Sequence, residues 1–208
     1  MSDSAWFKSF FGEDYFEIYR DAFPAEHTTR SEKNNRWRCE LLIRDARPGD
    51  RDRIREVTLA AYQEYAAQMP DLWEGYRQNI VATLARVEPA EQLVAERDDT
   101  IVGTVLLYPP RRVRPPRGES MEMPWPEVRL LAVAPAARGQ GIGAALMQEC
   151  VRRARVAGTG ALSLHTTDLM RTAMRMYERM GFARAPELDF HPAPGVTVKG
   201  FRLDLGAA

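Results

Sequence analysis

The chain has 208 residues, of which 45% are apolar and 28% charged. This composition is typical of a globular domain that buries a sizeable core, and the length leaves no room for a second full domain. Basic and acidic residues both number 29, and this balance argues against a dedicated nucleic-acid-binding protein. The two cysteines lack metal-ligand spacing, and no apolar run approaches the ~20 residues of a membrane span. We therefore expect a cytoplasmic protein with no metal site, nucleic-acid partner or membrane span.

Aromatic residues concentrate at the start of the chain. The first 38 residues hold nine of the 19 aromatic side chains, mostly three or four positions apart, which predicts an amphipathic helix. We therefore expect an aromatic N-terminal extension with a linker, residues 1–38, and a folded domain, residues 39–208. Residues 1–30 also resemble the opening segment of some SAM-dependent methyltransferases. No strand with a Gly-x-Gly-x-Gly loop follows them, so we expect no methyltransferase catalytic domain.

The first half of the domain alternates strands and helices. A short apolar strand is expected at 41–43 and a second helix from Asp71 to Leu84. Residues 92–95 and 101–108 are predicted strands of a hairpin. The first helix carries an apolar face formed by Ile54, Val57, Ala61, Tyr62 and Tyr65.

Residues 109–126 contain six prolines, which predicts a long irregular loop. The segments expected after it are a strand at 127–133, a helix at 141–156, a strand at 161–166, a helix at 169–180, and a final strand at 196–205. The apolar phase of the final strand changes at Lys199 and Gly200, which predicts a bulge there.

The glycine-rich run that follows the strand at 127–133 is the most informative stretch of the sequence. It reads Arg138-Gly139-Gln140-Gly141-Ile142-Gly143 and leads into an apolar helix. Alternate glycines at a helix N-terminus expose successive N–H groups to an anion, and phosphate is the expected guest.

Three phosphate-binding motifs contain glycine-rich runs of this kind. A P-loop is excluded because no Gly-Lys-Ser/Thr follows. Gly139, Gly141 and Ala144 fit the dinucleotide pattern G-x-G-x-x-A, but that pattern belongs in a first βαβ unit with an acidic residue about 20 positions later. Neither condition holds here. The remaining interpretation is a cradle for the pyrophosphate of coenzyme A.

Residues 127–182 resemble the core of the GNAT family of N-acetyltransferases. Arg138, Gly141 and Gly143 match the family signature Q/R-x-x-G-x-G/A. The triplet at 131–133 and the block at 177–182 match two further family blocks in the right order. The resemblance extends over about residues 41–205. It implies an α/β fold with a mixed, mostly antiparallel sheet, flanked by helices and splayed between the fourth and fifth strands.

The resemblance also implies a reaction. The family transfers an acetyl group from acetyl-CoA to a primary amine of a small molecule, peptide or protein, by direct attack in a ternary complex. An acyl-CoA-binding module without efficient catalysis is the alternative. The acceptor's identity and the oligomeric state stay open, a homodimer included. By the resemblance, the residues expected to bind acetyl-CoA are Leu131, Ala132, Val133, Arg138, Gly139, Gln140, Gly141, Ile142 and Gly143.

Two residues are expected to be catalytic. The resemblance places Tyr177 where the family carries a tyrosine that protonates the departing CoA thiolate, and a phenol has a pKa near that of a thiol. Glu127 lies four residues before Leu131, where some members carry a general base that works through water; an ordinary strand-edge glutamate is the alternative. His165 is either another base or a core histidine. Cys150 is interpreted as a buried small apolar residue.

The acceptor site is expected to use aromatic side chains of the first two helices, although the same rings could fill the core. The acceptor-binding residues predicted here are Tyr62, Tyr65, Trp73 and Tyr76.

One position departs from the family pattern. The family often has an asparagine where this chain has Met170, which leaves Thr166, Thr167 or Arg171 to supply a polar contact to CoA.

Overall fold

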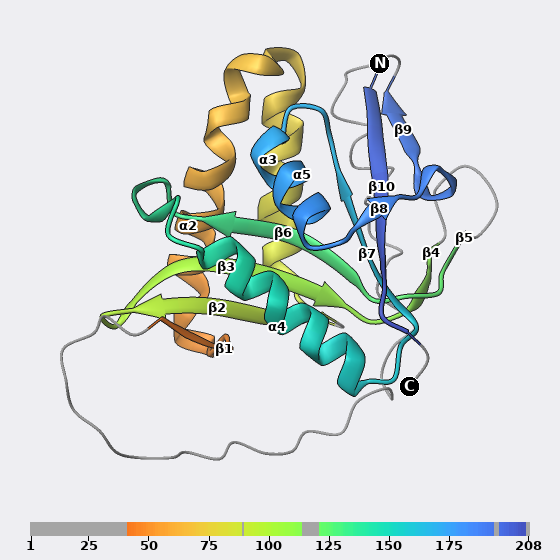
Figure 1. Cartoon of the computed structure of the whole chain (residues 1–208). Coiled ribbons are helices and arrows are strands. Elements are labelled where there is room, and N and C mark those ends of the chain that lie inside the picture. The colour runs from red at the N-terminus through yellow and green to blue at the C-terminus, as the bar shows by residue number, and fades with distance from the viewer. Residues whose placement is uncertain (1–40, 89, 114–120, 194–195, 207–208) are drawn as a thin grey trace.

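The chain folds into a mixed sheet flanked by helices (Figure 1). This computed structural model describes residues 41–206, apart from residue 89 and residues 114–120 and 194–195. Over these residues the main sheet has eight strands in the order β1-β2-β3-β6-β7-β10-β8, and β9 pairs with β10. The strands are β1 (Leu42–Asp45), β2 (Glu91–Arg97), β3 (Thr100–Tyr108), β6 (Glu127–Val133), β7 (Ala161–Thr166), β8 (Ala183–Arg184), β9 (Phe190–Ala193) and β10 (Val196–Asp204).

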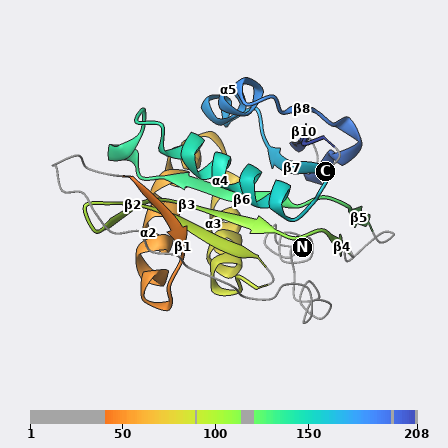
Figure 2. The ribbon, with the colours of Figure 1, turned by 60° about the horizontal axis from the view of Figure 1, so that its bottom comes forward.

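Helices cover both faces of this sheet. Figure 2 shows α2 (Arg51–Tyr62) and α3 (Pro70–Ala85) on one face, and α4 (Ile142–Val156) and α5 (Arg171–Arg179) on the other. The largest apolar cluster lies between the sheet, α4 and α5, and contains the fully buried Leu146, Met147 and Leu162. A helix with a three-to-four-residue apolar repeat buries one stripe in this way, which is why the spacing in the sequence predicted α2 and α4.

The sheet opens between β6 and β7. These two strands run parallel and pair at Glu127 with Ser163 and at Val128 with Leu164. β10 follows β7 as far as Thr166, whereas β6 diverges toward α4. Counted along the main sheet, β6 is the fourth strand and β7 the fifth, so the predicted splay between them is confirmed.

A β-bulge interrupts β6 just beyond its contact with β7. The register against β3 shifts so that Leu130 and Leu131 stand together opposite Val105. Leu130 has a φ of 48°, a value that a leucine rarely adopts. The extra residue sends the Leu130 side chain toward α2 and α3 and the Leu131 side chain toward α4.

Two predictions about local structure are wrong. Residues 109–126 are not wholly irregular, because β4 (Arg111–Val113) pairs antiparallel with β5 (Met121–Met123). Opposite charges on Arg112 and Glu122 pair across this hairpin, which composition alone does not reveal. Lys199 and Gly200 are regularly paired with β7, and the irregularity in β10 lies earlier, between Val196 and Val198, where β9 adds to the strand. The predicted extension, residues 1–38, lies outside the described residues.

Candidate acetyl-CoA site

The loop between β6 and α4 has the backbone shape that an anion-binding turn requires. Gly139 and Gly141 have φ values of 74° and 79°, in the left-handed region that favours glycine. No atom lies within 4 Å of where a Cβ would stand at either position, so the surface in front of the loop is open. The short turn of Pro135–Ala137 precedes the glycines and joins them to β6.

α4 begins immediately after these glycines. Gly141 is its N-cap. The first N–H group with an acceptor inside the helix is that of Ala145, which donates to the Gly141 carbonyl over 3.0 Å. The N–H groups of the first turn therefore have no acceptor inside the helix. Together with the positive end of the dipole of a 15-residue helix, they favour a negatively charged group in front of Ile142 and Gly143.

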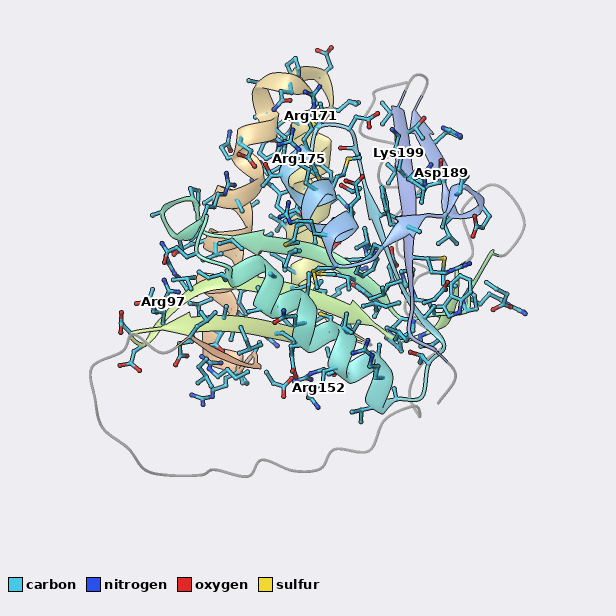
Figure 3. The ribbon with its side chains drawn as sticks, viewed as in Figure 1. Arg97, Arg152, Arg171, Arg175, Asp189 and Lys199 are labelled. Carbon is cyan, nitrogen blue, oxygen red and sulfur yellow. The ribbon has the colours of Figure 1, made fainter. Side chains whose placement is uncertain are left out.

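Two polar side chains of the loop are used to fix its position. Arg138 donates to the Glu64 carboxylate over 2.6 Å and to the Ala61 carbonyl over 2.9 Å, which ties the loop to the end of α2. Gln140 accepts a hydrogen bond from the guanidinium of Arg97, one of the arginines labelled in Figure 3. Because both side chains hold the loop in place, the groups that the loop presents to a ligand are its backbone N–H groups.

The diverging end of β6 presents backbone groups to the splay. Ala134 donates to the Val102 carbonyl of β3 over 2.9 Å, so Ala132 and Ala134 direct their backbone groups toward β3. Because these directions alternate along a strand, Leu131 and Val133 direct theirs away from β3, where β7 no longer pairs. This edge has the geometry to accept an extended chain as an added strand.

Tyr177 projects from α5 into the apolar cluster between the sheet, α4 and α5. Its side chain is 6% exposed and its ring packs on Phe182, with centroids 5.9 Å apart. The hydroxyl makes no hydrogen bond to a described residue. Burial raises the pKa of Tyr177, as does the nearby Tyr65 phenol, so the hydroxyl keeps its proton at neutral pH.

The predicted acceptor residues form one aromatic cluster on the opposite face, between α2 and α3. The Tyr62 ring packs edge-on against those of Tyr65 and Tyr76, with centroids 6.0 and 5.9 Å apart, and Trp73 packs on Tyr76. The Tyr62 hydroxyl reaches the Leu131 carbonyl over 3.5 Å. The cluster therefore extends to the strand edge that borders the splay.

Glu127 lies buried where β6 and β7 separate. One carboxylate oxygen accepts from His165 Nδ1 over 2.8 Å, and the other pairs with the Arg111 guanidinium of β4. Burial alone would raise the pKa of Glu127, but the Arg111 charge and the His165 hydrogen bond outweigh it and hold the pKa well below its usual range. The carboxylate is therefore ionised, and it is a weaker base than an exposed glutamate.

The two partners of His165 decide its protonation. Nε2 lies 2.9 Å from the Leu188 carbonyl, which can only accept, and Nδ1 faces the ionised Glu127. Both ring nitrogens must therefore donate, which makes His165 an imidazolium. Burial lowers the pKa of His165, but the hydrogen bond and charge of Glu127 more than offset it and raise the pKa above its ordinary value. Neither nitrogen is free to act as a base.

A sequence model of the acetyltransferase (GNAT) family matches residues 54–182, more than half of the chain. This span runs from α2 to just past α5, so it contains the splay, the glycine loop and Tyr177. The chain belongs to the acetyltransferase (GNAT) family. It is therefore an acetyl-CoA-dependent N-acetyltransferase, with acetyl-CoA as its co-substrate.

Relatives of this acetyltransferase differ in how much of their length it matches. An IAA acetyltransferase from Azospirillum brasilense is 27% identical over 68% of this chain and 87% of its own length. A mycothiol acetyltransferase from Stackebrandtia nassauensis is 28% identical over 79% of this chain, which spans about half, 52%, of that protein. A GNAT family acetyltransferase from Brucella melitensis, solved in complex with acetyl-CoA, is 27% identical with a TM-score of 0.52, over 81% of this chain and 90% of that one.

The glycine loop and the β6 edge of this acetyltransferase suit the phosphates and the extended arm of acetyl-CoA. The left-handed glycines leave the loop open in front of N–H groups that have no acceptor within α4. The edge of β6 continues from this loop into the splay, where β7 no longer pairs with it.

None of the described helices is long and apolar enough to cross a membrane. Within the same residues, no cluster of three or more His, Cys, Asp or Glu side chains is placed to hold a metal ion.

Arg111 lies in the buried charge group with Glu127 and His165, although the basic run that contains it predicts either solvated loop charges or a site that attracts an acidic acceptor or phosphates. It lies 16 residues before Glu127, and its guanidinium also stacks over the Tyr108 ring, 4.6 Å from the centroid. The only sequence signal for Arg111 is a basic run in a proline-rich segment, which resembles any solvated loop.

Cys150 is fully buried, and burial raises the pKa of its thiol to about 12, so it remains an inert thiol.

Proposed function

We propose that the glycine loop, the edge of β6 and Tyr177 form one site in which acetyl-CoA binds on the α4 and α5 side of the splay. The observation that carries this proposal is the coincidence of the splay with the glycine loop. The loop offers N–H groups to a pyrophosphate, and the β6 edge starts next to it and runs into the gap. In this proposal, the residues that contact acetyl-CoA are Leu131, Ala132, Val133, Arg138, Gly139, Gln140, Gly141, Ile142 and Gly143.

The proposed chemistry divides between the β6 edge and Tyr177. Acetyl-CoA would supply the acetyl group as a thioester, whose sulfur leaves as a thiolate when an amine attacks the carbonyl. The Val133 N–H, directed into the splay, polarises that carbonyl by hydrogen bonding. Tyr177 donates its phenolic proton to the sulfur. Burial keeps this proton on the phenol but also makes Tyr177 a weaker acid; a thiolate that forms in the same buried space is a stronger base for the same reason, which keeps the transfer feasible.

The acceptor amine enters, in this proposal, from the face of the sheet that carries α2 and α3. The aromatic cluster of Tyr62, Tyr65, Trp73 and Tyr76 supports this, since it ends at the Leu131 carbonyl. Rings of this kind contact an apolar body and leave the amine to approach the strand edge. We therefore propose a primary amine on a small molecule or peptide with an apolar group beside it.

Glu127 enters the proposal as the predicted base, acting through water on the acceptor ammonium. Its oxygens retain lone pairs beyond those used by His165 and Arg111. Because its lowered pKa makes it a weak base, Glu127 would accept a hydrogen bond from a water molecule, and that water would take the ammonium proton and pass it to solvent. A strand-edge glutamate without catalytic effect is the competing outcome of the test.

Calorimetry with acetyl-CoA, followed by a thiol-release assay over a panel of amines, tests the proposal. We expect binding of acetyl-CoA and release of CoA with at least one primary amine that carries an apolar group. Binding without turnover on any amine would favour the acyl-CoA-binding module. Absence of acetyl-CoA binding would refute the proposed site.

A further inference from the structure

Arg129 is a half-buried cation on the face of the sheet that carries α2 and α3. Val128, the residue before it, packs in the apolar cluster below α4. Because side chains alternate along a strand, Arg129 points to the opposite face. Tyr108 of β3 lies on that same face, since its neighbour Leu107 also packs below α4. The Arg129 guanidinium stacks on the buried Tyr108 ring, 5.4 Å from the centroid, which fixes its position there.

Arg129 also lies at the opening of the splay. β6 and β7 last pair at Val128 and Leu164, so Arg129 is the first residue of β6 beyond that pairing. Leu131 and Val133, which form the edge proposed to hold the thioester, follow it on the same strand. An acceptor that reaches this edge from the α2 and α3 face therefore approaches alongside the Arg129 side chain.

The charge of Arg129 acts on both the aromatic cluster and the buried carboxylate. Burial raises the pKa values of Tyr62 and Tyr76, and the Arg129 charge partly offsets this rise. Burial also raises the pKa of Glu127, and the Arg129 charge adds to the larger effects of the two bonded cations that lower it. Arg129 is therefore close to the rings proposed to contact the acceptor and to the carboxylate proposed to act as the base.

The charge group around Glu127 is richer in cations than in anions. Three of its four members are positive and one, Glu127, is negative. The positive members are Arg111, Arg129 and the His165 imidazolium. Such a group repels an ammonium ion and stabilises an anion. An unprotonated alkylamine is neutral and gains little from it, whereas an unprotonated amino acid keeps the negative charge of its carboxylate.

We infer that Arg129 binds the carboxylate of the acceptor, and that the acceptor is an amino acid with an apolar side chain. This inference rests on the proposed function. A guanidinium that lays its flat face on a ring carries its N–H groups around its edge, where two of them match the two oxygens of a carboxylate. The aromatic cluster then contacts the apolar side chain, and the amine lies next to the β6 edge. Arg129 stands on β6, outside the basic run that contains Arg111.

Arg129→Met tests the inference, since methionine keeps an unbranched side chain and removes both the charge and the N–H groups. The assay compares CoA release with L-phenylalanine and with 2-phenylethylamine, which lacks only the carboxylate, with kcat/KM expressed per unprotonated amine. The wild type should prefer phenylalanine at least about tenfold, the effect of one charged hydrogen-bonded pair. Arg129→Met should lose this preference. Arg129→Lys keeps the charge without the paired N–H groups and should retain part of it.

Two controls separate this effect from a disturbed fold. Arg202→Met removes a guanidinium that also stacks on an aromatic ring, 5.1 Å from the Trp125 centroid. Arg202 lies on β10 and its charge is paired with Glu187 and Asp204, so the preference for phenylalanine should not change. Calorimetry of Arg129→Met with acetyl-CoA should give the wild-type Kd, because Arg129 points away from the α4 side of the splay.

The other outcomes each overturn one claim. If the wild type acetylates 2-phenylethylamine or another amine without a carboxylate at least as fast as phenylalanine, the inference is wrong and the proposed function stands. If the wild type prefers phenylalanine and Arg129→Met keeps that preference, the carboxylate binds elsewhere and the assignment of Arg129 fails. If the wild type binds no acetyl-CoA, the proposed function fails first and this inference fails with it.

Discussion

His165 Nδ1 donates to Glu127 Oε1 over 2.8 Å across the point where β6 and β7 separate. The bond joins Glu127, where the short pairing of β6 with β7 begins, to His165, which lies just beyond that pairing on β7. Arg111 completes the group from β4, and the Leu188 carbonyl fixes the second nitrogen of the imidazolium. A buried carboxylate between two cations therefore holds the two halves of the sheet together at the base of the proposed site.

The charge on His165 makes stability depend on pH. The pKa of His165 is raised in the folded state, so its contribution is complete below the unfolded value of about 6.5 and is lost as the pH rises through the folded value. The groups near it are Glu127, which favours the charge, and Arg129, which opposes it. The unfolding free energy of the wild type minus that of His165→Gln should therefore shrink as the pH rises above about 6.5.

Urea unfolding at several pH values measures this difference, with His191→Gln as the control. His191 is exposed and bonds Thr197 over 3.2 Å, so its replacement leaves the buried charge group intact. A stability difference for His165→Gln that stays constant with pH would show that folding does not raise the pKa of His165.

Glu127→Gln should destabilise the protein by about 3–5 kcal/mol, because it leaves the buried Arg111 and His165 charges without their counter-charge. The control Glu122→Gln removes an exposed partner of Arg112 and should cost at most about 1 kcal/mol. Chemical unfolding measures both. The predicted role as a base adds a second effect, a fall of about a hundredfold in kcat per folded molecule. An unchanged kcat would leave Glu127 with its structural role alone.

Tyr177→Phe should lower kcat by at least about a hundredfold and leave the Kd for acetyl-CoA nearly unchanged. The hydroxyl makes no hydrogen bond to a described residue, and phenylalanine keeps the packing on Phe182, so little besides the proton is lost. Steady-state kinetics and calorimetry separate the two effects. If kcat survives the substitution, another group protonates the thiolate.

Gly141→Glu should abolish binding of acetyl-CoA. It puts a side chain and a negative charge in front of the N–H groups that would hold the pyrophosphate. Gly158→Glu is the matched control, because Gly158 also has a positive φ, 67°, and open space around a Cβ, yet lies beyond the other end of α4. The two variants should lose similar stability, about 1–2 kcal/mol from the left-handed backbone, and only Gly141→Glu should lose binding. Retained affinity in Gly141→Glu would refute the cradle.

Gly200→Ala should destabilise the fold by about 1–3 kcal/mol through overpacking. A Cβ at this position would stand 2.4 Å from the Leu188 Cβ and 2.8 Å from the Ala185 carbonyl oxygen, so the segment that bonds His165 would have to move. Gly160→Ala, where no atom lies within 4 Å, is the control and should change stability by much less. Equal unfolding midpoints for the two variants would contradict the close approach of Leu188 to β10.

The sequence alone determined the order of the main elements and the position of the glycine loop. Both are local properties: a three-to-four-residue apolar repeat defines α2 and α4, and alternate glycines define a turn that other residues cannot adopt. The family blocks at 131–133, 138–143 and 177–182 are local as well. For that reason the splay between β6 and β7 could be predicted before any contact was known.

Only the tertiary structure decided which distant residues meet. Arg111, Glu127 and His165 are separated by 16 and 38 residues, and their contact depends on the placement of β4 and on the parallel pairing of β6 with β7. The burial of the Thr166 hydroxyl, and the lack of a hydrogen-bond partner for it among the residues that the structure describes, are likewise not encoded by any spacing in the chain. Periodicity specifies the face on which a side chain lies, whereas its partners and its charge follow from what the fold packs against that face.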